Sequence, residues 1–318
     1  MMKRPFRSRA QRHLTLLALF ISLCTSAQET YCFAERDTCA LFLDIFRPDS
    51  NAQTTFKGVA KPAIMFLFGG GFVAGSRSES NVRGWFSRLT ANGYTIVAID
   101  YRLGMKGYRM AKGLGGALKA LGRFVLSQQI GVEDVFSAVS FLAAHPELNV
   151  PPDNIVISGS SAGAIISLAC AYAIANGQTE GLPDGFSFKG VMSFAGGIIS
   201  KKGAPKFTKA PCPLLLFHGT ADKIVAYDHF GAMGRGIWGS CYIAKKMKKM
   251  GGNYSIWRFQ DHGHDVASYM PVMWDIEKGF LEKNVIQGIP CQVDALVDDP
   301  SLPTWGSPRK DKTADLYQ

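Results

Sequence analysis

The chain has 318 residues, of which 47% are hydrophobic and 19% charged, and its formal net charge is +10. This length and apolar content favour a single globular domain and exclude a disordered or fibrous chain. Five basic residues lie within the first twelve positions, and the remaining 30 Lys and Arg against 25 Asp and Glu are too balanced to indicate a nucleic-acid-binding protein.

Residues 1–27 are typical of a secretory signal peptide. Basic residues come first, an apolar run follows from Leu14 to Cys24, and three small residues then offer a cleavage site. The apolar run is too short to span a bilayer, and no later segment contains about 18 consecutive apolar residues. We therefore expect a secreted or periplasmic protein without stable membrane insertion. Acylation of Cys24 is a less favoured alternative, because a bulky leucine precedes it.

The next segments predict strands. Residues 31–48 indicate two short strands, and a hairpin here would let Cys32 and Cys39 face each other in an oxidising compartment. The apolar run Ala63–Phe68 ends in three glycines, and a second run covers Tyr94–Ile99. Continuous apolar runs of this length are typical of buried strands.

Residues 103–129 do not match the pattern of a core element. They mix glycines, lysines and apolar residues, and we interpret them as a small cap-like insertion over the functional site. Clear helical periodicity follows over residues 132–144, where Val135, Val139 and Leu142 share one side.

The most informative motif is Gly159-Ser160-Ser161-Ala162-Gly163. It follows the apolar run 154–158 and precedes a stretch that indicates a helix, the context of a nucleophile elbow. Such a turn strains the backbone of its central residue, so the positions two residues away must lack bulk. We therefore expect Ser161 to be an exposed nucleophile at the positive N-terminal end of a helix. An ordinary glycine turn is the alternative.

Strands and helices alternate through the rest of the chain. We expect strands at 190–194, 213–217 and 254–259, and helices near 240–250 and 265–283. This alternation predicts an α/β protein with a mostly parallel central sheet and helices on both faces. After Asn284 the sequence becomes polar and loses periodicity. The expected domains are a signal peptide at 1–27, a catalytic domain at 28–284 and a partly disordered C-terminal extension at 285–318.

Two later strand ends supply partners for a serine nucleophile, which needs a base that a carboxylate orients. Asp222 follows the strand at 213–217, and His264 follows the strand at 254–259. We choose His264 as the base because Gly263 allows a close approach and a helix starts directly after it. His262 is the competing candidate.

Acyl transfer also needs hydrogen-bond donors for a developing oxyanion. Gly70 and Gly71 follow a predicted strand, and glycines let successive backbone N–H groups converge on one point. With the N–H of Ala162, they form the expected oxyanion hole. No Cys or His spacing indicates a metal, and this chemistry requires no cofactor.

Three motifs together resemble the α/β-hydrolase superfamily. They are Phe68–Phe72, Asp100–Leu103 and the segment from Asp153 to the elbow. Within the superfamily the chain is similar to the esterase/lipase branch, which includes hormone-sensitive-lipase-like carboxylesterases and bacterial feruloyl and acetylxylan esterases. The similarity extends over about residues 31–280.

The resemblance implies an α/β-hydrolase fold and roles for the residues already named: Ser161 as nucleophile, His264 as base, Asp222 as its orienter, and Gly70, Gly71 and Ala162 as oxyanion donors. It implies structural roles for Asp100 and Arg102. One position departs from the family pattern, because Phe68 replaces the histidine that usually precedes the three glycines. A phenylalanine cannot hold the glycine loop by hydrogen bonds.

We therefore expect a secreted serine carboxylic-ester hydrolase that works through an acyl-enzyme. The resemblance implies a small ester or an acylated carbohydrate, with acetyl or feruloyl groups, as its substrate. A serine peptidase of the same fold is one alternative, although such enzymes usually carry an additional large domain. A binding protein that has kept the fold and lost catalysis is another.

Overall fold

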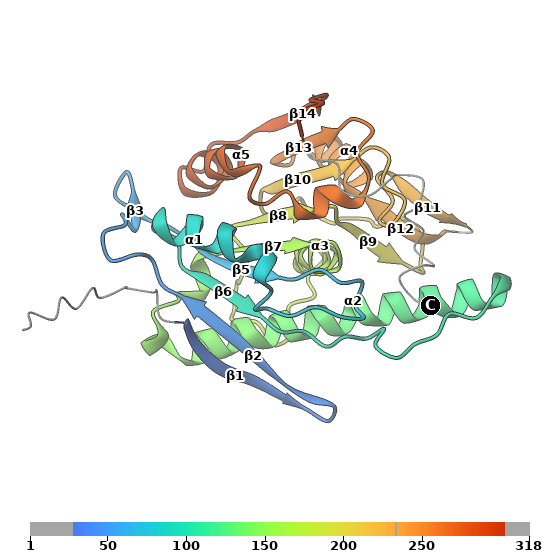
Figure 1. Cartoon of the computed structure of the whole chain (residues 1–318), viewed down its shortest axis with the longest axis horizontal. Helices are drawn as coiled ribbons and strands as arrows, with labels where there is room; N and C mark the ends of the chain where they lie inside the picture. Colours follow the sequence, from blue (N-terminus) through green and yellow to red (C-terminus); the bar gives the residue numbers. More distant parts are fainter. Residues whose placement is uncertain (1–27, 233, 303–318) are drawn as a thin grey trace, which may run out of the picture.

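The computed structural model describes residues 28–232 and 234–302 (Figure 1). The predicted signal peptide, including Cys24, and the last 16 residues of the predicted extension lie outside these ranges. In the part of the chain that is described, no helix is long and apolar enough to cross a membrane.

A mixed sheet forms the centre of the molecule. Within the described residues it has nine strands in the order β1-β2-β6-β5-β7-β8-β10-β13-β14. The β1–β2 and β2–β6 pairs are antiparallel and every other pair is parallel. The strands are β1 (Gln28–Arg36), β2 (Cys39–Phe46), β5 (Ala63–Leu67), β6 (Ile96–Ile99), β7 (Ile155–Ser160), β8 (Gly190–Phe194), β10 (Leu214–Gly219), β13 (Tyr254–Phe259) and β14 (Gln292–Val297).

Helices cover both faces of this sheet, as the α/β alternation predicts (Figure 1). One face carries α1 (Arg83–Ala91) and α5 (Trp274–Gly279), and the other carries α3 (Ala162–Ala175) and α4 (Ser240–Met250). The longest helix, α2 (Gly113–Ala144), packs against α3. The α/β-hydrolase fold expected from the sequence is therefore confirmed.

Smaller elements complete the architecture. A second sheet has the order β11-β12-β9, and a separate hairpin joins β3 to β4. Their bounds are β3 (Thr55–Phe56), β4 (Val59–Ala60), β9 (Gly197–Ser200), β11 (His229–Ala232) and β12 (Arg235–Gly239). Short 3₁₀ helices cover Ser80–Val82, Pro146–Leu148, Pro152–Asn154 and His264–Ser268, and a π-helix covers Phe280–Ile286.

The segment expected to be an insertion is largely helical. Residues 113–129 are the first half of α2, which continues without interruption into the predicted helix at 132–144. Glycines at four positions lower the intrinsic helix propensity and hide this half in the sequence. Gly116 is required there, because a Cβ at this position would lie 1.8 Å from the carbonyl oxygen of Ala111.

The C-terminal part also differs from expectation. Pro271 cannot continue a helix, and the helix predicted at 265–283 is divided into a 3₁₀ helix, α5 and the π-helix. Beyond the predicted end of the catalytic domain at 284, β14 pairs with β13 at the edge of the central sheet.

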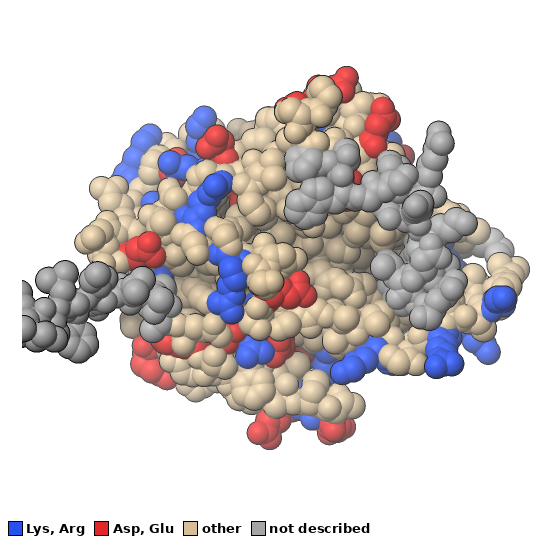
Figure 2. Space-filling model, in the orientation of Figure 1, with Lys and Arg blue, Asp and Glu red and all other residues tan. Residues whose placement is uncertain are grey.

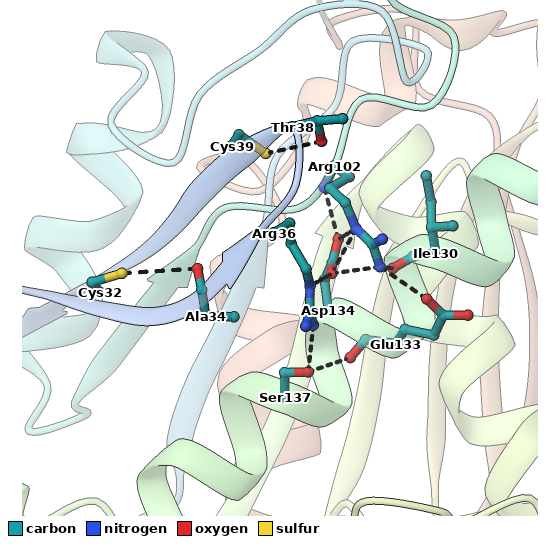
Figure 3. Close-up of polar contacts among 10 residues, drawn as sticks. All are labelled: Cys32, Ala34, Arg36, Thr38, Cys39, Arg102, Ile130, Glu133, Asp134 and Ser137. Atoms are coloured by element: carbon teal, nitrogen blue, oxygen red, sulfur yellow. Dashed lines mark hydrogen bonds and ion pairs between the residues drawn. The ribbon is translucent and has the colours of Figure 1, made fainter.

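The hairpin of β1 and β2 forms as predicted, but its cysteines do not face each other. A two-residue turn places Cys39 opposite Arg36, so Cys32 lies opposite Phe42 instead. Both cysteines are exposed free thiols. Figure 3 shows them apart, with Cys32 near the carbonyl of Ala34.

Candidate active site

The turn between β7 and α3 has the geometry of a nucleophile elbow. Ser161 has φ 50° and ψ −114°, a conformation that side chains other than glycine rarely adopt. Its flanking glycines make this turn possible. A Cβ on Gly159 would lie 2.3 Å from the backbone of Gly163, and one on Gly163 would lie 2.2 Å from the carbonyl oxygen of Leu67. The N–H of Ser161 donates to Phe194 O at 2.9 Å, which ties the turn to β8.

The structure brings Ser161, His264 and Asp222 together in one chain of hydrogen bonds. Ser161 Oγ lies 2.7 Å from His264 Nε2, and His264 Nδ1 lies 2.8 Å from Asp222 Oδ2. The three residues come from the carboxyl ends of β7, β13 and β10, which the parallel sheet places at one edge. Because the carboxylate accepts the Nδ1–H, Nε2 is free to accept the serine proton.

Asp222 is held as an anion in a buried position. Its Oδ1 accepts hydrogen bonds from the N–H groups of Ile224 at 2.8 Å and Val225 at 3.0 Å. Burial alone would raise the pKa of Asp222, but the charge of His264 and the hydrogen bonds from His218 and His264 together lower it well below its ordinary value. Asp222 can therefore orient His264 as a carboxylate throughout the neutral range.

His218 is a member of this site that the sequence analysis missed. It is fully buried, and its Nε2 lies 3.0 Å from Val225 O and 3.3 Å from Asp222 Oδ2. A carbonyl oxygen can only accept, so Nε2 carries a proton and also faces the carboxylate. The hydroxyl of Ser240 lies 2.8 Å from Nδ1 and can donate to it. The signal in the sequence is a histidine at the end of β10, four residues before the predicted aspartate.

His262, the competing candidate for the base, has other hydrogen-bond partners than the serine. It is buried, with Nδ1 2.8 Å from Asp265 Oδ2 and 2.7 Å from the Tyr269 hydroxyl. Its backbone carbonyl accepts a hydrogen bond from Ala221 N at 2.9 Å. These contacts fix the loop that carries His264, and it is His264 that contacts the serine.

The glycine loop lies directly against the nucleophile. A Cβ on Gly69 would lie 3.5 Å from Ser161 Cβ. Gly70 and Gly71 have φ values of 105° and 61°, in the region that favours glycine. Ala162 is the first residue of α3, so its N–H lies at the helix N-terminus beside the serine. The three expected oxyanion donors thus occupy segments next to Ser161.

Tyr101 anchors the glycine loop at Phe68, which is the position where the family pattern has a histidine. Its hydroxyl donates to Phe68 O at 2.8 Å, and its ring stacks on Phe68 with centroids 4.3 Å apart. Phe68 is almost fully buried. The loop is therefore held by a hydrogen bond from the neighbouring strand end and by packing of the phenylalanine.

Asp100 and Arg102 make structural ion pairs. Asp100 pairs with Arg77 at 2.6 Å, and Arg102 pairs with the fully buried Asp134 on α2 at 2.9 Å. Arg36 of β1 reaches the same carboxylate at 3.3 Å (Figure 3). The two pairs with Asp134 join the strand ends to α2, whereas Arg77 bridges Asp100 and the buried Asp44 of β2.

A hollow of about 1350 Å³ lies along α2, apart from the serine and its two partners. Its walls include Phe33, Val132, Tyr172 and Ile199, and neither the serine nor its partners line it. Among the residues the structure describes, no cluster of three His, Cys, Asp or Glu is placed to hold a metal.

Comparison with solved structures shows the fold. Apo esterase 2 of Thermogutta terrifontis is 22% identical, with a TM-score of 0.57 over 81% of this chain and 96% of that one.

Two curated relatives match over shorter segments. The neuroligin-like protein glit-1 of Caenorhabditis elegans is 41% identical over 80 residues, 24% of this chain and 10% of that protein. Carboxylesterase patB of Aspergillus clavatus is 29% identical over 145 residues, 42% of this chain and 24% of that protein. The matches thus span at most a quarter of these relatives. The profile of the carboxylesterase family matches residues 22–182, half of the chain, so the protein belongs to the carboxylesterase family.

Proposed function

We propose that the protein is a serine carboxylic-ester hydrolase. The observation that carries this proposal is the continuous hydrogen-bonded chain from Ser161 through His264 to Asp222, built on a strained elbow. A protein that had lost catalysis would have no reason to keep this strain together with all three residues. Membership of the carboxylesterase family supports the same reaction class.

The reaction proceeds in two halves. Ser161 Oγ attacks the ester carbonyl while His264 Nε2 takes the hydroxyl proton, and Asp222 stabilises the resulting imidazolium. The tetrahedral intermediate collapses, and His264 gives its proton to the departing alcohol, which leaves an acyl-enzyme. Water then attacks with His264 again as base, the carboxylic acid departs, and Ser161 regains its proton.

The N–H groups of Gly70, Gly71 and Ala162 are the proposed oxyanion donors. Each such donor is worth about 3–4 kcal/mol of transition-state stabilisation in enzymes of this type. Their support is the position of the glycine loop against Ser161 and the start of α3 directly after it.

Export and the nature of the ester are finer parts of the proposal. The signal-peptide pattern of residues 1–27 supports secretion or a periplasmic location. Acetyl or feruloyl groups on carbohydrates are the proposed acyl groups, on the strength of the resemblance to esterases of that kind.

The test is hydrolysis of p-nitrophenyl acetate and butyrate by residues 28–318. We expect turnover that falls by about 10⁴-fold or more in Ser161→Ala. His264→Gln should cause a comparable loss of turnover. The matched variant His262→Gln should lose much less turnover, because it retains the nucleophile and its base.

A fluorophosphonate probe should label the wild type and not Ser161→Ala. Equal turnover by the wild type and Ser161→Ala would overturn the proposed mechanism. Labelling without turnover of any ester would indicate a reactive serine and would contradict the proposed hydrolase activity. The absence of both labelling and turnover would favour the binding-protein alternative.

A further inference from the structure

The N-terminal half of α2 extends beyond the sheet. The helix has 32 residues and is about 48 Å long. Figure 1 shows this half running past the strands to the edge of the molecule. Of residues 113–119, only Gly116 is buried. We refer to residues 106–119 as the α2 tip.

The α2 tip is basic. Residues 106–119 include four Lys and Arg and no Asp or Glu. The side chains of Lys106, Arg109, Lys112 and Lys119 are exposed in or beside the first helical turns. In Figure 2, blue side chains gather over this end of α2 without red ones between them. The surface therefore favours an anionic partner.

The α2 tip also exposes large apolar side chains. Leu114 is 71% exposed and Leu118 is 38% exposed, and their spacing of four residues places them on the same side of the helix. The ridge continues through Leu121 to Val125, which is 5% exposed. A ridge that is buried at the body and bare at the tip has no explanation in the core packing.

We propose that the α2 tip adsorbs to the interface of an anionic lipid bilayer. Exposed leucines beside lysines and arginines are the combination that lies in a bilayer interface, with the apolar groups among the acyl chains and the cations at the headgroups. A soluble polyanion would use the cations and leave the leucines in water. The combination therefore favours an anionic membrane, and this adsorption does not depend on the hydrolase activity.

The experiment measures co-sedimentation of residues 28–318 with phosphatidylcholine vesicles and with vesicles containing 30% phosphatidylserine. We expect binding to the anionic vesicles that weakens as salt is raised, because the headgroup attraction is screened. Lys112→Gln/Lys119→Gln should lower the partition coefficient about 30-fold, since each lysine near the surface contributes about 1 kcal/mol. Leu114→Ser/Leu118→Ser should lower it to a similar extent.

The matched control is Lys248→Gln/Lys249→Gln, which removes the same charge from exposed positions on α4. This control should bind like the wild type. No binding to anionic vesicles, or equal loss in the control, would overturn the proposal. Binding that depends on the lysines but not the leucines, and that soluble heparin displaces, would identify a polyanion surface instead. Thermal unfolding and p-nitrophenyl ester turnover should be unchanged in all three variants.

Discussion

His218 is fully buried, and it can influence the catalytic base without contacting the substrate. Asp222 holds His264 with Oδ2, and His218 Nε2 faces the same oxygen at 3.3 Å. Hydrogen bonds to charged groups contribute about 1.5–3 kcal/mol. We infer that His218 is a positioning residue, since it acts on the base only through the carboxylate.

Replacing His218 by leucine should therefore lower kcat about 10-fold to 100-fold while KM changes little, because orientation of His264 matters in the transition state and not in ester binding. His218→Gln retains a donor and should recover part of the loss. Steady-state kinetics on p-nitrophenyl butyrate, with thermal unfolding as the control for folding, measures both. A rise in KM with kcat unchanged would contradict the positioning role.

Tyr101 joins two functions in one side chain, because its ring packs on Phe68 and its hydroxyl holds the carbonyl of Phe68. Tyr101→Phe separates them by keeping the ring and removing the hydroxyl. We expect a loss of about 1 kcal/mol in the free energy of unfolding and a several-fold lower kcat, since the glycine loop loses its anchor. Urea unfolding and ester kinetics test this; an unchanged kcat would show that packing alone holds the loop.

At the scale of the elements, the contact between α1 and α5 contains the buried carboxyl group of Glu277. Trp85 Nε1 of α1 donates to Glu277 Oε2 of α5 at 2.6 Å, and Glu277 is fully buried. Burial raises the pKa of Glu277 well above 4.5, although the hydrogen bond from Trp85 and the charge of Arg88 oppose the shift. The folded protein thus holds this carboxyl in its neutral form to a higher pH than the unfolded chain does.

The contribution of Glu277 to stability is fully present below about pH 4.5, where both states are protonated, and is lost as the pH rises toward the folded-state pKa. Glu277→Gln keeps an acceptor for Trp85 and removes the titration. Urea unfolding between pH 5 and 9 should show a flatter pH dependence in this variant than in the wild type. Parallel curves would contradict the assignment.

Most elements of the fold can be predicted from the sequence, but the first half of α2 and strand β14 cannot. The strands and the elbow are predictable because buried parallel strands are short apolar runs, and their ends bring Ser161, Asp222 and His264 to one edge. The first half of α2 is not, because its glycines mask the helical period. Strand β14 is missed because it alternates between exposed and half-buried residues at a sheet edge, a weak pattern over six residues.

Contacts between side chains are also beyond a single sequence. Cys32 and Cys39 have suitable spacing for a bridge, yet the turn is centred two residues beyond the point that would pair them, which changes every pair in the hairpin. His262 and His264 differ by two positions and point to different partners because of local loop geometry.

For the molecule as a whole, two carboxyls limit stability from opposite sides. Asp222 has a lowered pKa, so its contribution is present above about pH 3.8 and is lost as the pH falls below that value. Glu277 acts in the opposite direction as the pH rises. The contributions of these two carboxyls to stability are therefore both fully present only between about pH 3.8 and 4.5.

Along the chain, the nucleophile Ser161 comes before both of its partners. The segment between α3 and β8 is a loop with exposed positions, and it separates Ser161 from both Asp222 and His264. A cut there yields one fragment with the nucleophile and another with its base and carboxylate, neither able to turn over ester by itself. Ester hydrolysis then reports only the reunited pair, so the fold offers a natural division point for a split-enzyme sensor of fragment association.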